Sequence, residues 1–139
     1  MKMVVLALAT LYATICAVFD ARTFRVPNAL TLPALGMELA YRVMASTVID
    51  EPILPALAGV LFLYAAWFND FIGGADAKVM MALWLLYPDP SFGVTVCAVI
   101  AIYGVIRRAL RLTSKLPALV PTALGVWVYS VPAVLALFR

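Results

Sequence analysis

The sequence has no histidine and only two cysteines, Cys16 and Cys97, among its 139 residues. The two cysteines lie far apart within apolar runs, so no Cys/His metal cluster or disulfide framework is expected. Charged residues make up 12% of the chain, against roughly 25% in ordinary soluble domains. These scarcities argue against a zinc protein, a disulfide-stapled domain and a water-soluble enzyme.

Apolar residues are correspondingly abundant, at 66% of the chain with a mean hydropathy of +1.07. A soluble domain this small leaves most of its residues partly exposed to water, so an apolar excess of this size must face lipid. A membrane-spanning helix uses about 17–25 residues, and about six short spans therefore account for most of the chain. The sequence predicts an all-α polytopic membrane protein of about six transmembrane helices, with residues 1–139 forming a single membrane-embedded domain.

Turn residues divide the chain into the expected helices. An apolar run from Met3 to Phe19 is the first span, and a cleaved signal peptide is the weaker alternative because Arg22 and Arg25 follow the run. Prolines and paired glycines interrupt the rest of the chain. The later helices are expected at about residues 29–46, 53–71, 75–87, 91–106 and 117–138.

Basic residues are distributed unevenly between the two sides of this topology. Seven fall on one side and two on the other: Arg22, Arg25, Lys78, Arg107, Arg108, Arg111 and Lys115, against the terminal Lys2 and Arg139. Because cytoplasmic loops carry the excess of Lys and Arg, the side with seven is predicted to be cytoplasmic. Both termini and the acidic turns at Asp50-Glu51 and Asp89 are then expected on the extracytoplasmic side.

Two aspartates are predicted at the same depth on the cytoplasmic side. Asp20 follows the first span and Asp76 begins the fourth helix, after the small residues Gly73, Gly74 and Ala75. Small residues allow another backbone to approach closely, and an anion is favoured at a helix N-terminus. Each aspartate alone could simply end a span among the lipid headgroups. Together they are the strongest functional signal, because ionisable groups at a membrane are costly without a partner or a function.

A pair of carboxylates suits the hydrolysis of a peptide bond. One ionised aspartate takes a proton from water, while the other, protonated, polarises the scissile carbonyl. Like charges a few ångströms apart acquire different pKa values, which permits this division of labour. The sequence leaves open which aspartate is the base.

Both motifs resemble those of the type IV prepilin peptidases, the aspartic membrane peptidases of the GxGD class. The first motif is Asp20 with Arg22, Arg25 and Val26-Pro27-Asn28, and the second is Gly73-Gly74-Ala75-Asp76-Ala77-Lys78. With the six-span layout, the resemblance extends over essentially the whole chain. It implies that Asp20 and Asp76 are the catalytic pair and that neither a metal nor another cofactor takes part.

The sequence departs from the bacterial pattern of this family in two ways. Ala75 stands where many bacterial members have the second glycine of GxGD, a form similar to the archaeal prepilin and preflagellin peptidases. The cytoplasmic methyltransferase domain of full-length bacterial enzymes, with its paired cysteine motifs, has no counterpart. The resemblance therefore implies cleavage without N-methylation, in an archaeal or short bacterial enzyme.

The resemblance also implies a substrate and a location. The expected partners are prepilin- or preflagellin-like precursors, in which a short basic class III signal peptide precedes an apolar helix, cut at the cytoplasmic face of the cell membrane. The precursor could be a pilin, an archaellin or a sugar-binding protein with the same leader. Asp70 is the candidate for attracting the basic leader. An equal alternative is that Asp70, like Asn69, is simply a solvated residue at the end of a helix. Lys78 is expected to contact lipid phosphate. The weaker alternative is that it lowers the pKa of a nearby carboxylate.

Two further interpretations remain open at this point. Glu38 and Arg42 are spaced as an i,i+4 ion pair within the second helix, in the more favourable order, and are expected to be structural. The rival functions are a small channel or transporter subunit whose aspartates relay protons, and a non-catalytic assembly subunit of a pilus or archaellum. A relay needs carboxylates deep along a pathway, and an assembly subunit leaves the paired motifs unexplained.

Overall fold

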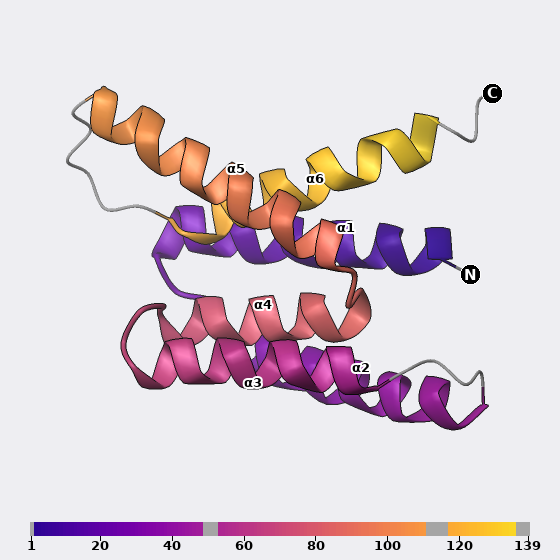
Figure 1. Cartoon of the computed structure of the whole chain (residues 1–139). Helices are drawn as coiled ribbons and strands as arrows, with labels where there is room; N and C mark the ends of the chain where they lie inside the picture. The colour runs from indigo at the N-terminus through magenta and orange to yellow at the C-terminus, as the bar shows by residue number, and fades with distance from the viewer. Residues whose placement is uncertain (1, 49–52, 111–116, 136–139) are drawn as a thin grey trace. The chain divides into compact units, whose positions relative to one another are not determined.

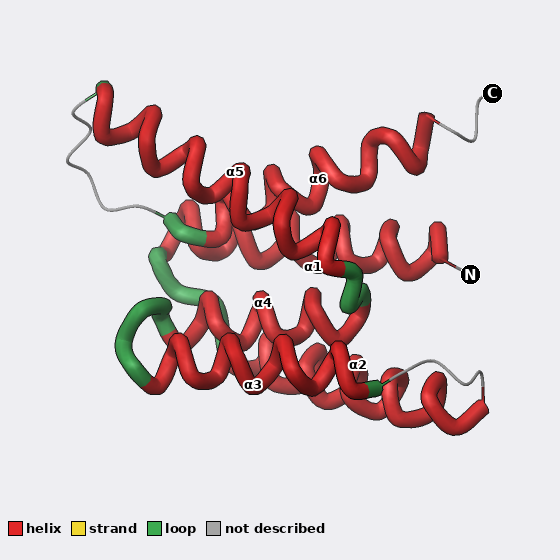
Figure 2. Tube along the Cα trace, in the orientation of Figure 1, coloured by secondary structure: helices red, strands yellow, loops and turns green. Residues whose placement is uncertain are grey.

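The computed structural model describes residues 2–48, 53–110 and 117–135, and within these ranges every regular element is a helix (Figures 1 and 2). The bounds are α1 Lys2–Thr23, α2 Asn28–Val48, α3 Leu54–Phe68, α4 Gly74–Leu86, α5 Pro90–Ala109 and α6 Leu119–Leu135. The all-α prediction is therefore confirmed for this part of the chain. The expected turn at Asp50-Glu51 and the basic residues Arg111, Lys115 and Arg139 lie outside the described residues.

The described helices differ in their ability to cross a bilayer. Two are long and apolar enough to do so, over Val4–Thr23 in α1 and over Pro90–Ala109 in α5, while Leu54–Phe68 and Leu119–Pro132 are apolar but shorter. Helix α4 has only 13 residues, which corresponds to about 20 Å against a hydrocarbon core of about 30 Å. Of the six expected spans, the described helices support two directly.

The chain folds as two compact units. The first unit comprises Met1–Phe24 with Pro90–Arg139 and contains α1, α5 and α6. The second unit, Arg25–Asp89, contains α2, α3 and α4. In the first unit α6 packs against both α1 and α5, and in the second α4 packs against both α2 and α3.

Polar side chains join α1 to α6 in the first unit. The indole nitrogen of Trp127 donates to the hydroxyl of Thr14 at 3.1 Å, and the hydroxyls of Thr10 and Ser130 lie 3.5 Å apart. The paired residues rise along one helix as they fall along the other, so the two helices are antiparallel. Hydrogen bonds of this kind contribute about 1 kcal/mol each, and here they also fix the register of α6 on α1.

In the second unit, the C-terminal end of α4 makes hydrogen bonds to both neighbouring helices. The indole nitrogen of Trp84 donates to the carbonyl of Pro55 on α3 at 3.0 Å. On the side of α2, Arg42 donates through Nε to the carbonyl of Leu85 at 2.8 Å and through a terminal nitrogen to that of Leu86 at 3.3 Å. These carbonyls belong to the last turn of α4, where they have no partner within the helix.

The contacts of Arg42 extend beyond the pair with Glu38 that the sequence predicts. Its guanidinium is buried and joins α2 to the C-terminal end of α4. Glu38, one turn earlier on α2, is within electrostatic reach of this charge. Arg42 therefore also binds backbone carbonyls of α4, which no sequence pattern indicates. That its role is purely structural stays a prediction.

Candidate active site

Asp20 lies in the last turn of α1 and caps a different helix. Its side chain is 7% exposed, and its Oδ2 accepts a hydrogen bond of 2.9 Å from the backbone N–H of Leu119. Leu119 is the first residue of α6, and the first N–H groups of a helix have no partner within it. The carboxylate therefore sits at the positive end of α6, where an anion is stabilised.

The chain turns sharply just after Asp20. The N–H of Phe24 donates to the carbonyl of Asp20 at 2.8 Å, and Phe24 has a left-handed backbone with a φ of 52°. This conformation ends α1 but is unusual for a bulky residue. The neighbouring Arg22 and Arg25 are exposed, whereas Val26 is buried.

Asp76 lies in the first turn of α4 and folds back over the residue that precedes the helix. A Cβ added to Gly73 would lie 2.9 Å from Oδ2 of Asp76, closer than real Cβ atoms approach other atoms. Gly73 itself has a φ of −67° and a ψ of 149°, a conformation open to any residue. A side chain at position 73 would therefore have to displace the Asp76 carboxylate, while the backbone there imposes no need for glycine.

Gly74 makes room for a different group. A Cβ at this position would lie 3.2 Å from the indole nitrogen of Trp67 on α3. The sequence predicts that the small residues before Asp76 let another backbone approach. In the structure the approaching groups are side chains, the Asp76 carboxylate at Gly73 and the Trp67 indole at Gly74. Ala75, the third small residue, is partly exposed in the same turn.

Helix α3 is followed by Asp70, whose backbone is in the left-handed conformation. The N–H of Asp70 donates to the carbonyl of Trp67 at 3.0 Å and that of Phe71 to the carbonyl of Ala66 at 2.9 Å, the pattern of a Schellman cap. Asp70 has a φ of 59° and an exposed side chain. Helix α3 therefore ends at Phe68, slightly earlier than the sequence predicts.

Lys78 joins the two sequence motifs within the second unit. Its Nζ donates to Oδ1 of Asn28 at 2.8 Å, across 50 positions of sequence. Asn28 begins α2 and Lys78 lies near the start of α4, so this contact and that of Arg42 at the opposite end make α2 and α4 parallel. Asn28 belongs to the first motif, but no sequence pattern indicates this bond. The expected roles of Lys78 at lipid phosphate or at a carboxylate remain predictions.

The site residues divide between the two units. The second unit brings together Asp70, Gly73, Gly74, Ala75, Asp76 and Lys78 around the start of α4, while Asp20 belongs to the first unit with α6. The pairing of Asp20 with Asp76 therefore stays a prediction. Within the ranges that the structure describes, no group of three or more Cys, Asp or Glu residues is placed to hold a metal ion.

The sequence profile of the type IV leader peptidase family matches residues 6–107, which include both aspartates and both motifs. The chain belongs to this family of peptidases, and the resemblance to the type IV prepilin peptidases is confirmed. No curated protein and no solved structure matches the chain. The matched range ends before α6 begins at Leu119.

Proposed function

We propose that this protein is an aspartic endopeptidase that removes the short basic class III signal peptide from prepilin- or preflagellin-like precursors. Family membership supports the peptidase activity. The observation that carries the aspartic mechanism is that both candidate carboxylates lie within the matched range, each at the N-terminal end of a helix. An anion at such an end is stabilised without a metal ion.

In the proposed reaction, Asp20 and Asp76 act together on one peptide bond. The ionised aspartate takes a proton from water as the water oxygen bonds to the carbonyl carbon, and the protonated aspartate gives its proton to the carbonyl oxygen. The C–N bond then breaks, and the amine leaves with the proton held by the first aspartate. One hydroxyl of the intermediate returns its proton to the second aspartate as the carboxylic acid forms, which restores both aspartates to their starting states.

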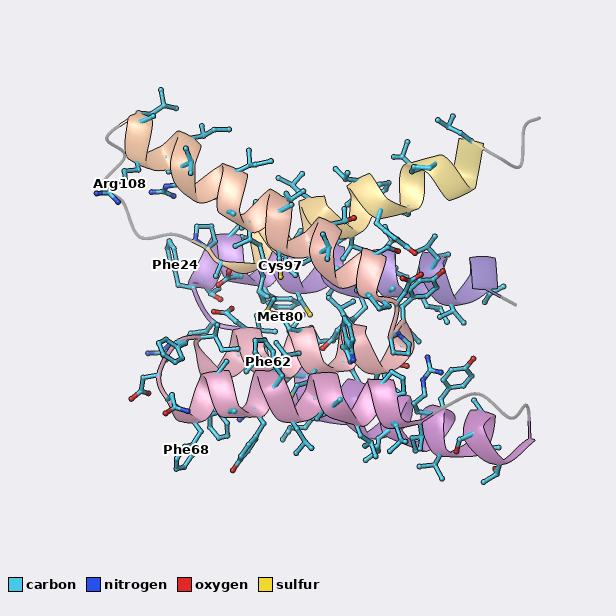
Figure 3. The ribbon with its side chains drawn as sticks, viewed as in Figure 1. Phe24, Phe62, Phe68, Met80, Cys97 and Arg108 are labelled. Carbon is cyan, nitrogen blue, oxygen red and sulfur yellow. The ribbon has the colours of Figure 1, made fainter. Side chains whose placement is uncertain are left out.

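The proposed location is the cell membrane, crossed several times by one peptidase domain with its active site at the cytoplasmic face. The seven basic residues assigned to that face support this orientation, with both termini outside. Large apolar side chains exposed on α3 and α5 support contact with lipid, among them Phe62, Phe68, Val94 and Val105. Figure 3 shows Phe68 pointing away from α3.

The proposed substrate has a basic leader, and Asp70 is the residue proposed to attract it. Its position is costly for the fold, because a left-handed residue at the end of a helix is usually glycine or asparagine. A carboxylate there also faces the negative end of the α3 dipole. An exposed aspartate kept at such a position supports a role in binding cationic segments.

Replacing each aspartate by asparagine tests the proposed function. The amide oxygen of Asp20→Asn can still accept the N–H of Leu119, so α6 keeps its cap, but the amide cannot carry the catalytic proton. We expect Asp20→Asn and Asp76→Asn each to lower the cleavage rate by about 10²–10⁴-fold with melting temperatures close to the parent. The double variant should lose little more, because catalytic groups that act as a unit are not additive.

The measurement is mass spectrometry of a purified precursor incubated with purified protein in detergent or liposomes. A precursor whose leader has lost its Lys and Arg residues is the matched substrate control. Either single variant cutting at nearly the parent rate, while correctly folded, would rule out the proposed pair.

A further inference from the structure

We propose that the N-terminus of α6 belongs to the catalytic machinery, because the backbone N–H of Leu119 orients the Asp20 carboxylate. This inference rests on the proposed function. It concerns a helix that lies outside residues 6–107, the range matched by the family profile. Leu119 is thus a positioning residue, acting through Asp20.

The hydrogen bond gives the Leu119 N–H an acceptor and the buried Asp20 carboxylate a donor. The N–H of Val120 already donates to the carbonyl of Pro117 at 3.3 Å, while the N–H of Leu119 donates to Oδ2 of Asp20 at 2.9 Å. Leu119 is 1% exposed and Asp20 is 7% exposed. A bond to a carboxylate is stronger than one between neutral groups, and a buried environment strengthens it further.

The rest of the α1–α6 interface holds the donor in place. The contacts of Thr14 with Trp127 and of Thr10 with Ser130 fix α6 along α1, so the first residue of α6 stays level with Asp20. Anchoring Oδ2 restricts rotation of the carboxylate. The precision of this placement matters, since a misplacement of about 1 Å can cost about 10²-fold in rate.

The critical variant is Leu119→Pro, which removes the N–H at a position where proline suits the start of a helix. Leu119→Ala is the matched control, because both variants lose much of a fully buried side chain but only Leu119→Ala keeps the donor. We expect the kcat of folded Leu119→Pro to be about 10–100-fold lower than that of folded Leu119→Ala, with KM nearly the same in the two variants. A purely structural role would lower the amount of folded protein and leave the kcat of the folded fraction alone.

If Leu119→Pro does not fold, an ester linkage gives the same test with less disturbance. The α-hydroxy acid of leucine in place of Leu119 replaces the N–H by an ester oxygen and keeps the side chain, although it also weakens the Ala118 carbonyl as an acceptor. Turnover of both donor-free variants at the rate of Leu119→Ala would overturn the proposal.

A second readout does not depend on activity. A membrane-permeant carbodiimide labels carboxyl groups, and mass spectrometry should show Asp20 labelled several-fold faster in the donor-free variants than in Leu119→Ala. The exposed Asp70 should be labelled at the same rate in all of them. If the parent cleaves no precursor, the proposed function fails, and equal labelling of Asp20 in all variants would overturn the anchoring as well.

Discussion

At the scale of single residues, Gly73 and Asp76 depend on one another. The carboxylate of Asp76 occupies the space that a side chain at position 73 would need. The backbone angles of Gly73 are ordinary, so an alanine there disturbs the carboxylate and little else. Asp76 therefore owes its position to the missing side chain of its neighbour as well as to the first turn of α4.

Gly73→Ala should for this reason reduce activity more than stability. Because the carboxylate must move away from the new Cβ to reach ordinary contact, we expect a loss of about 10–100-fold in kcat, with a melting temperature close to that of the parent. Gly36→Ala is the control, because no atom lies within 4 Å of a Cβ at this helical position. It should leave activity unchanged and stabilise α2 by about 0.5–1 kcal/mol. Parent-like turnover in Gly73→Ala would contradict the steric explanation.

At the scale of elements, α2 and α4 are joined at both ends by basic side chains. Lys78 contacts Asn28 where both helices begin, and Arg42 reaches the carbonyls of Leu85 and Leu86 where α4 ends. The first contact is exposed and the second is buried. Because burial removes the competition of water, the buried Arg42 contact is expected to contribute more to stability than the exposed Lys78 contact.

Arg42→Met should destabilise the fold by about 3–5 kcal/mol, since it leaves Glu38 without its cation and two carbonyls without donors. Lys78→Met should cost about 1 kcal/mol. If Glu38 and Arg42 formed only an isolated ion pair, the double variant Glu38→Leu/Arg42→Met would recover the lost stability. Because Arg42 also caps α4, the double variant should remain destabilised. Denaturant titration in detergent compares them, and a double variant as stable as the parent would contradict the capping role.

At the scale of the whole molecule, the main feature is an apolar surface on described helices of both units. On α3 and its end, Phe68 is 74% exposed and Phe71 is 82% exposed. On α5, apolar side chains are exposed along the helix up to the basic Arg107 and Arg108, and Figure 3 shows Arg108 near the end of this helix. Apolar surface ending in basic residues is the pattern expected at a cytoplasmic membrane boundary.

The proposed orientation predicts which positions are accessible from each side. In a variant without Cys16 and Cys97, a cysteine introduced at Thr23 should react with an impermeant maleimide from the cytoplasmic side. One introduced at Pro88 should react from the opposite side. Sealed vesicles of both orientations provide the comparison, and labelling of position 23 from outside would reverse the proposed location of the active site.

The sequence by itself determined the helical class and most of the helix boundaries. Asn28 begins α2, Gly73 precedes α4 and Pro88 follows it, close to where proline and glycine predicted these breaks. Such signals are local, because they depend on the backbone preferences of one or two residues. The two motifs likewise identified the family, because their residues lie close together in sequence.

Only the tertiary structure decided which groups those residues contact. Leu119 donates to Asp20 across 99 positions and Lys78 to Asn28 across 50, while Arg42 reaches carbonyls of another helix. A backbone N–H or carbonyl is present at nearly every residue, so no sequence pattern marks the one that a distant side chain will meet. That choice follows from the register in which packed helices lie, which is a property of the folded chain.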